Sequence, residues 1–216
     1  MIEELCNFAA HQWKFSFSSP EVRKQFEDTD RKICIAAHTT PFFDGMILHK
    51  ALQSLNVSDH TFYVKGLFGL GPQWCKEIPN TKGFIVKEVE ELRKHVKFCR
   101  VIFPSGGQVV WRSGYYVLAK ETGASIIILG LDYHRREVVV DSILNPDIDV
   151  KDVNTMALQR LRKYGPGPLY FVLRVLLGYG CMTYDVSPLA LFSTRSLMIL
   201  GLLAAARYIM PPFYVV

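Results

Sequence analysis

The chain has 216 residues, the size of one domain with a short appendage. Half of the residues are hydrophobic and 21% are charged, which excludes an intrinsically disordered chain and supports a globular core. The net charge of +5 is only mildly basic, so we expect no nucleic-acid partner.

The first third of the chain alternates apolar runs with one amphipathic stretch. Residues 1–30 mix aromatic and charged side chains and are predicted to form an N-terminal helical or interfacial segment. The short apolar run over 32–37 predicts a buried strand. Apolar residues at helical spacing predict a helix over 44–55, and 61–64 is predicted to be a second strand before a glycine-rich loop.

The middle of the chain continues the alternation. A helix is predicted over 86–96, a strand over 99–103 and a helix over 114–120, with Gly123 as the stop signal of that helix. Residues 125–131 are apolar throughout, which predicts a strand buried on both faces.

A further strand over 137–140 and a charged helix over 153–164 complete the series. The order β-α-β-α-β-α-β-β-α predicts an α/β domain over 31–167, with a central, mostly parallel sheet flanked by helices.

The C-terminal region, 168–216, differs from the rest because it contains only 4 of the 45 charged residues. Its longest uncharged run, 196–206, is shorter than the roughly 20 residues of a spanning helix, but 189–210 is long enough if its arginines lie near the interface. The alternatives are a pair of core helices or a membrane-embedded segment, either spanning or monotopic. Eight aromatic residues suited to an interface favour an apolar, membrane-associated helical tail.

The cysteines and the N-terminal residues indicate which cellular compartment the domain faces. The five cysteines are scattered and form no C-x-x-C pair, which predicts neither a disulfide framework nor a zinc site and fits a reducing compartment. The acidic start lacks the pattern of a signal peptide. We therefore expect the domain to face the cytoplasm.

The sharpest local feature is a histidine and an aspartate around the first predicted helix. His38 leaves a buried strand, and Asp44 follows six residues later, with Thr40 and Pro41 suited to the start of a helix. A carboxylate one turn into the helix can orient an imidazole, which then acts as a general base on a hydroxyl. The alternative is a solvated loop histidine with a helix-capping aspartate.

Two further features follow other predicted strands. Ser105, Gly106 and Gly107 come after a strand, and paired glycines let backbone N–H groups form an anion-binding nest, or simply a turn. Basic residues in loops are candidate phosphate ligands or ordinary surface charges; they are Lys65, Lys82 and Arg112. His38, His49 and His60 recur at intervals of eleven residues, which we interpret as coincidence, and no metal site is expected.

Taken in order, these features resemble the glycerolipid acyltransferase family, the lysophosphatidic acid acyltransferase-like proteins. His38 and Asp44 occupy the place of its first motif, although five residues separate them instead of the usual four. Residues 78–82 (Ile-Pro-Asn-Thr-Lys) match its Ile-Pro-Val-Asp-Arg motif, and 103–108 (Phe-Pro-Ser-Gly-Gly-Gln) match its Phe-Pro-Glu-Gly-Thr-Arg motif in position. Residues 111–133, from Trp-Arg-Ser-Gly-Tyr-Tyr to Asp-Tyr, resemble the bacterial members, and the likeness covers 33–140, half of the chain.

The resemblance implies a glycerol-3-phosphate acyltransferase-like fold and an acyl-CoA-dependent O-acyltransferase on a membrane. It implies catalysis by His38 and Asp44, and substrate binding by the residues of the second and third motifs and by the loop cations. Acyl-CoA would be a co-substrate, and no metal or other cofactor is required. Ser105 stands where the family has glutamate, which makes a neutral glycerolipid as plausible an acceptor as lysophosphatidic acid or another lysophospholipid.

Three other interpretations stay open. The first is a catalytically silent relative that binds lipid, the second is a hydrolase that uses the same base on water, and the third is an enzyme with a cysteine nucleophile. The hydrolase lacks a Gly-x-Ser-x-Gly elbow, and Cys34 and Cys99 lie in predicted buried strands.

Overall fold

The computed structural model describes residues 2–37, 43–57, 59–64, 72–78, 83–104, 113–161 and 163–164. The chain divides into two compact units, Met1–Gly167 and Pro168–Val216, and all described residues belong to the first. The predicted tail over 168–216 therefore lies outside the described residues. Within the described ranges, no helix is both long and apolar enough to span a bilayer.

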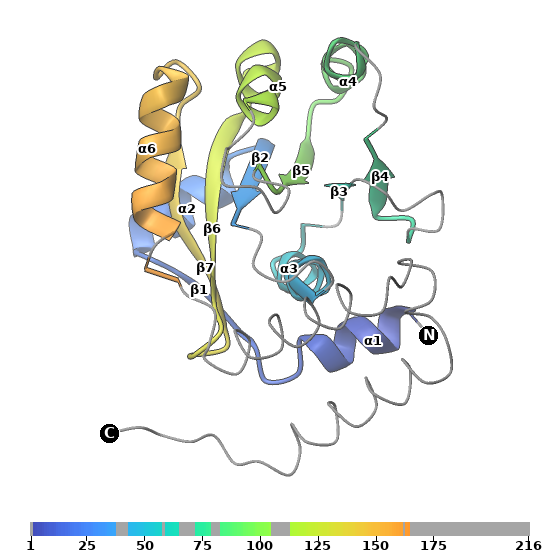
Figure 1. Ribbon diagram of the computed structural model, residues 1–216, viewed down its shortest axis with the longest axis vertical. Helices are drawn as coiled ribbons and strands as arrows, with labels where there is room; N and C mark the ends of the chain where they lie inside the picture. Colours follow the sequence, from blue (N-terminus) through green and yellow to red (C-terminus); the bar gives the residue numbers. More distant parts are fainter. Residues whose placement is uncertain are drawn as a thin grey trace, which may run out of the picture. The chain divides into compact units, whose positions relative to one another are not determined.

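The described part of the chain is built on a seven-stranded sheet with the order β1-β7-β6-β2-β5-β3-β4 (Figure 1). Strands β2 to β6 run parallel to one another, whereas β7 is antiparallel to β6 and β1 is parallel to β7. The prediction of a mostly parallel sheet is confirmed. The strands are β1 (Lys14–Phe17), β2 (Arg31–Ala36), β3 (His60–Val64), β4 (Cys75–Glu77), β5 (Phe98–Ile102), β6 (Ser125–Asp132) and β7 (Glu137–Leu144).

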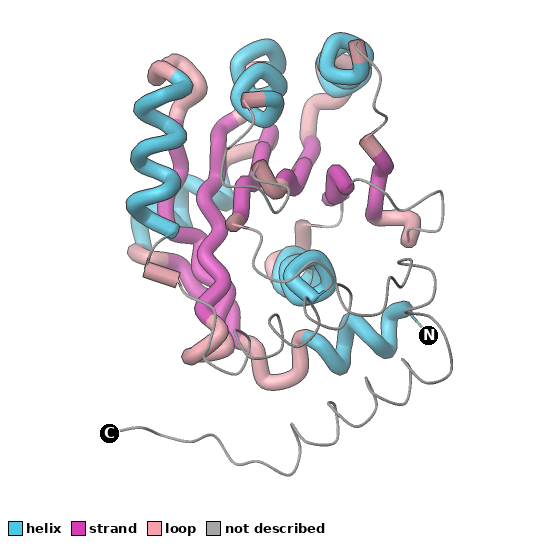
Figure 2. The backbone as a smooth tube through the Cα atoms, in the orientation of Figure 1, coloured by secondary structure: helices cyan, strands magenta, loops and turns pink. Residues whose placement is uncertain are grey.

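Helices cover both faces of this sheet. Figure 2 shows α1 and α3 on one side of the strands and α4, α5 and α6 on the other, and Phe26 of α2 packs in the same apolar cluster as α1 and α3. Alternate residues of β2 point to opposite faces of the sheet. Cys34 packs in the apolar cluster with α1 and α3, and Ile33 packs in the cluster with α4, α5 and α6. The helices are α1 (Ile2–Ala9), α2 (Pro20–Asp28), α3 (Phe43–Ser54), α4 (Phe84–Leu92), α5 (Gly114–Thr122) and α6 (Val150–Leu161).

Several local predictions are confirmed. Strand β6 is buried from Ile126 to Leu131, as an uninterrupted apolar run requires. Gly123 ends α5 with a φ of 65°, a left-handed conformation that glycine adopts without a Cβ clash.

The N-terminal segment contributes more than one helix to the domain. Residues 1–30 were predicted as a separate helical or interfacial segment, but they contain α1, β1 and α2. Strand β1 pairs with β7 from Lys14↔Glu137 to Phe17↔Val140, so the sheet extends beyond the predicted start at residue 31.

Helix α6 is anchored to the sheet through Tyr164, three residues after the helix ends. Gly130 of β6 makes room for the Tyr164 ring, since a Cβ at this position would lie 2.3 Å from Tyr164 Cδ2. The Tyr164 hydroxyl donates to Asp141 Oδ1 at 2.7 Å, and Asp141 is only 2% exposed. A buried carboxylate with a hydroxyl donor costs far less than an unpaired one, so this contact stabilises the packing of α6.

Candidate functional site

The parallel strands in the middle of the sheet end together at one edge. Ile35 of β2 pairs with Ile102 of β5, Ile102 pairs with Tyr63 of β3, and Val64 pairs with Glu77 of β4. The carboxyl ends of these four strands are therefore aligned. In α/β sheets, ligands bind beyond the carboxyl ends of the strands, so this edge is the natural place for a site.

Asp44 lies at this edge because it stands in the first turn of α3, the helix that follows β2. The residue is fully buried at 0% exposure. Its Oδ1 accepts a hydrogen bond from the hydroxyl of Tyr133, the residue that directly follows β6. Since β6 neighbours β2 in the sheet, the carboxylate is held between two adjacent strand ends. The predicted position of Asp44 at the start of a helix is confirmed.

Tyr133 is itself held in place by the N-terminal segment. The ring of Trp13, which precedes β1, packs edge-on against the Tyr133 ring with centroids 5.0 Å apart and an interplanar angle of 86°. Both rings pack against the apolar cluster beneath α1 and α3. Edge-to-face aromatic pairs of this kind restrict the ring, and so they direct its hydroxyl towards Asp44.

The other predicted site residues fall outside the described ranges, although the residues that lead to them are described. Ala37 follows β2 and precedes His38, Val64 ends β3 before Lys65, and Phe103 follows β5 two residues before Ser105. Of the predicted site residues, Asp44 alone is described. Those outside are His38, Lys65, Lys82, Ser105, Gly106, Gly107 and Arg112, and Thr40 and Pro41 of the predicted helix start lie outside as well.

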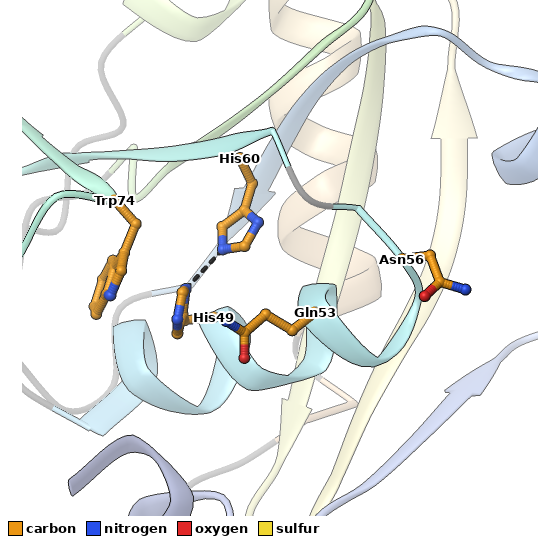
Figure 3. Close-up of a pocket in the computed structure, with 5 residues that line it drawn as sticks. All are labelled: His49, Gln53, Asn56, His60 and Trp74. Atoms are coloured by element: carbon orange, nitrogen blue, oxygen red, sulfur yellow. Dashed lines mark hydrogen bonds between the residues drawn. The ribbon is translucent and has the colours of Figure 1, made fainter. Parts of the chain in front are cut away.

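A second polar group lies away from this edge, around a hollow of about 450 Å³ (Figure 3). Its lining side chains come from the second half of α3, the turn after α3, the start of β3 and the turn before β4. His49 Nδ1 is 2.7 Å from His60 Nε2, and His49 stacks on the indole of Trp74 at 4.4 Å. The lining residues are His49, Gln53, Asn56, His60 and Trp74.

The hydrogen bonds assign a tautomer to each imidazole of this pair. His60 Nδ1 is 2.6 Å from the Val57 carbonyl oxygen, so it carries a proton, and His60 Nε2 accepts from His49 Nδ1. Burial and the neighbouring His60 lower the pKa of His49 to about 4, and burial lowers that of His60. His49 is therefore neutral near pH 7 and too weakly basic for general-base catalysis there.

Two of the three histidines spaced eleven residues apart, His49 and His60, lie together in the structure. The spacing was interpreted as coincidence, yet His49 and His60 are in direct contact because α3 lies across β3. Glu3 of α1 also approaches, with Oε2 at 3.8 Å from His49 Nε2 and Oε1 at 2.7 Å from Lys50 Nζ. The pair therefore helps to join α1, α3 and β3.

The described cysteines are free thiols in packing positions. Cys34 and Cys99 are at most 1% exposed, with sulfur atoms 3.6 Å apart on adjacent strands. The hydrogen bond with Cys99 and burial raise the pKa of Cys34 well above its ordinary value, which disfavours a nucleophilic thiolate. Within the described ranges, no three His, Cys, Asp or Glu residues are grouped as metal ligands.

Tyr133 was not among the predicted site residues, although it lies in the stretch that resembles bacterial acyltransferases. Its hydrogen bond to Asp44 joins residues 89 positions apart, and the one sequence feature that could have indicated it is the position of Tyr133 directly after a buried strand.

The chain matches no protein-family model, and no significant match was found among curated proteins or solved structures.

Proposed function

We propose that this protein is an acyl-CoA-dependent O-acyltransferase of the glycerolipid acyltransferase family, with a glycerol-3-phosphate acyltransferase-like fold. Its acceptor is the hydroxyl of lysophosphatidic acid, another lysophospholipid or a glyceride. Asp44 supports the proposal most directly, since it is fully buried in the first turn of the helix after β2 and accepts a hydroxyl donor. A buried carboxylate at the ligand-binding edge suits the task of orienting a base.

The sequence adjacent to this edge supplies the remaining groups. His38 follows the end of β2 by two residues, and the Ser105-Gly106-Gly107 turn follows the end of the neighbouring strand β5 by three. Lys65 directly follows β3, which is the next strand in the sheet. The alignment of these strand ends supports the idea that base, anion nest and cation act on one substrate.

The proposed reaction is a direct acyl transfer. His38 takes the proton of the acceptor hydroxyl while the oxygen attacks the thioester carbonyl carbon of acyl-CoA. Asp44 orients the imidazole and stabilises the imidazolium. Backbone N–H groups at Gly106 and Gly107 stabilise the oxyanion. The carbon–sulfur bond then breaks, an ester forms, and the CoA thiolate receives the proton from the imidazolium.

The substrates indicate where the protein works. Lys65, Lys82 and Arg112 bind phosphate groups of CoA or of the acceptor in this proposal. A long acyl chain enters from a bilayer, and the apolar tail over 168–216 holds the domain at the membrane surface, facing a reducing, cytoplasmic compartment. The reaction uses acyl-CoA as co-substrate and needs no resident cofactor.

Acyl transfer from labelled acyl-CoA by purified, detergent-solubilised protein tests the proposal. The acceptor panel comprises lysophosphatidic acid, other lysophospholipids, glycerol-3-phosphate, monoacylglycerol and diacylglycerol. His38→Ala is measured beside the wild type, and His95→Ala serves as a control because His95 is exposed, three residues after the end of α4.

The proposal predicts an acylated product that depends on His38 and not on His95. The preferred acceptor would then show whether Ser105 favours a neutral glycerolipid. A folded, lipid-bound wild type that acylates no acceptor would support the silent lipid-binding relative instead.

A further inference from the structure

The contact between Tyr133 and Asp44 joins two strand ends by a buried charge-assisted hydrogen bond. Tyr133 follows β6, Asp44 begins α3 after β2, and the Tyr133 hydroxyl donates to Asp44 Oδ1. Asp44 is 0% exposed, so no water competes for that oxygen from the surface. Hydrogen bonds to an ionised group in such surroundings are among the stronger ones in proteins.

We infer that Tyr133 is the positioning residue of Asp44, holding the carboxylate in the orientation in which it serves the catalytic base. The inference rests on the proposed function, because it assigns Tyr133 a part in orienting His38 through Asp44. An aspartate in the first turn of a helix rotates about two side-chain bonds. A hydroxyl bound to Oδ1 limits that rotation.

The packing around Tyr133 is consistent with a positioning role. Trp13 packs edge-on against its ring at 5.0 Å, and the strand β1 that follows Trp13 is fixed to β7 by four residue pairs. The N-terminal segment is thereby linked to the start of α3. A purely structural tyrosine would need only burial, whereas the Tyr133 ring is held so that its hydroxyl contacts the Asp44 carboxylate.

The hydrogen bond also affects charge. A donor at Oδ1 draws negative charge away from Oδ2, and so it weakens the stabilisation that Asp44 gives to a protonated imidazole. Replacing the hydroxyl by hydrogen should have two effects. Asp44 loses its fixed orientation, and the base holds its proton up to a higher pH.

The test compares wild type, Tyr133→Phe and Tyr164→Phe in acyl transfer. Tyr164 is a matched control because its hydroxyl also donates to a buried aspartate, Asp141, at 2.7 Å, and that pair lies outside the site. For Tyr133→Phe we expect kcat to fall about tenfold with KM for acyl-CoA little changed, since a bond to a charged group is lost. The acid limb of the kcat/KM profile should move to higher pH by about half a unit.

Tyr164→Phe should keep the wild-type pH profile even where it lowers stability. The inference is overturned if Tyr133→Phe keeps the wild-type pH profile, or if its loss of kcat is no larger than that of Tyr164→Phe.

A second readout does not depend on turnover. The titration of His38 is followed by NMR in wild type and Tyr133→Phe, with His38→Ala used to assign the signal. A shift of its midpoint to higher pH in Tyr133→Phe supports the positioning role even if the wild type acylates no acceptor, in which case only the proposed reaction fails. An unchanged midpoint overturns the inference, whatever the activity.

Discussion

His49 and His60 share a hydrogen bond of 2.7 Å between Nδ1 of the first and Nε2 of the second, inside the layer formed by α3 and β3. The bond requires His60 to be neutral, because its Nε2 accepts the proton of His49 Nδ1, and burial with the neighbouring His60 lowers the pKa of His49 so that it is neutral as well. Near His49 lie one carboxylate and one ammonium group, those of Glu3 and Lys50. The pair therefore makes folding sensitive to acid.

The first prediction concerns this sensitivity. The pKa of His49 is lowered from about 6.5 to about 4 in the folded protein. Between these two pH values His49 is protonated in the unfolded chain and neutral in the folded chain. The contribution of His49 to stability is present above pH 6.5 and is lost as the pH falls towards 4, by about 1.4 kcal/mol for each pH unit.

The variant His49→Phe keeps a ring on Trp74 but cannot be protonated. We expect it to be less stable than wild type at pH 7, and the difference in free energy of unfolding should shrink between pH 6.5 and 4. Denaturant unfolding at several pH values measures this. A constant difference across that range would show that His49 is not the group that responds.

The second prediction concerns the packing of Tyr164 on β6. In Gly130→Ala the new methyl group would lie 2.3 Å from the Tyr164 ring, so the ring or the strand must move. We expect the free energy of unfolding to fall by about 2 kcal/mol, the usual cost of an overpacked core position. Adding Tyr164→Ala should make the glycine substitution nearly neutral. Equal costs of Gly130→Ala in both backgrounds would contradict the steric explanation.

The third prediction concerns the tail over 168–216, which carries few charges and many aromatic residues. Deleting it removes the second compact unit at its boundary with the first. We expect the shortened protein to appear in the soluble fraction after membranes are sedimented, with the full chain in the pellet. If the shortened protein stays in the pellet, the N-terminal aromatic segment is the anchor instead.

Most regular elements could be predicted from the sequence, and those missed have physical reasons. Strand β1 has only four residues at the sheet edge and mixes lysine and serine with phenylalanine, so its pattern is weak. Strand β4 has three residues, none of them fully buried. Helix α2 did carry a signal, because Ser19 accepts from the Val22 N–H and Pro20 begins the helix.

The candidate site could be predicted only where its residues are close in sequence. The position of Asp44 follows from the strand-to-helix pattern around it. Its partner Tyr133 and the contact between His49 and His60 depend on which strands are neighbours and how α3 crosses them. Periodicity within single elements does not determine those relationships.

Asp44 serves acyl transfer in the proposed function, and the isosteric variant Asp44→Asn tests that role most directly. The amide oxygen can still accept from Tyr133, while the negative charge is lost. Asp141→Asn is the matched control, since Asp141 is also buried and bound to a tyrosine hydroxyl outside the site. The measurement is kcat/KM for acyl transfer to the preferred acceptor. We expect a loss of about a hundredfold or more for Asp44→Asn and wild-type rates for Asp141→Asn. Undiminished transfer by a folded Asp44→Asn protein would contradict the account.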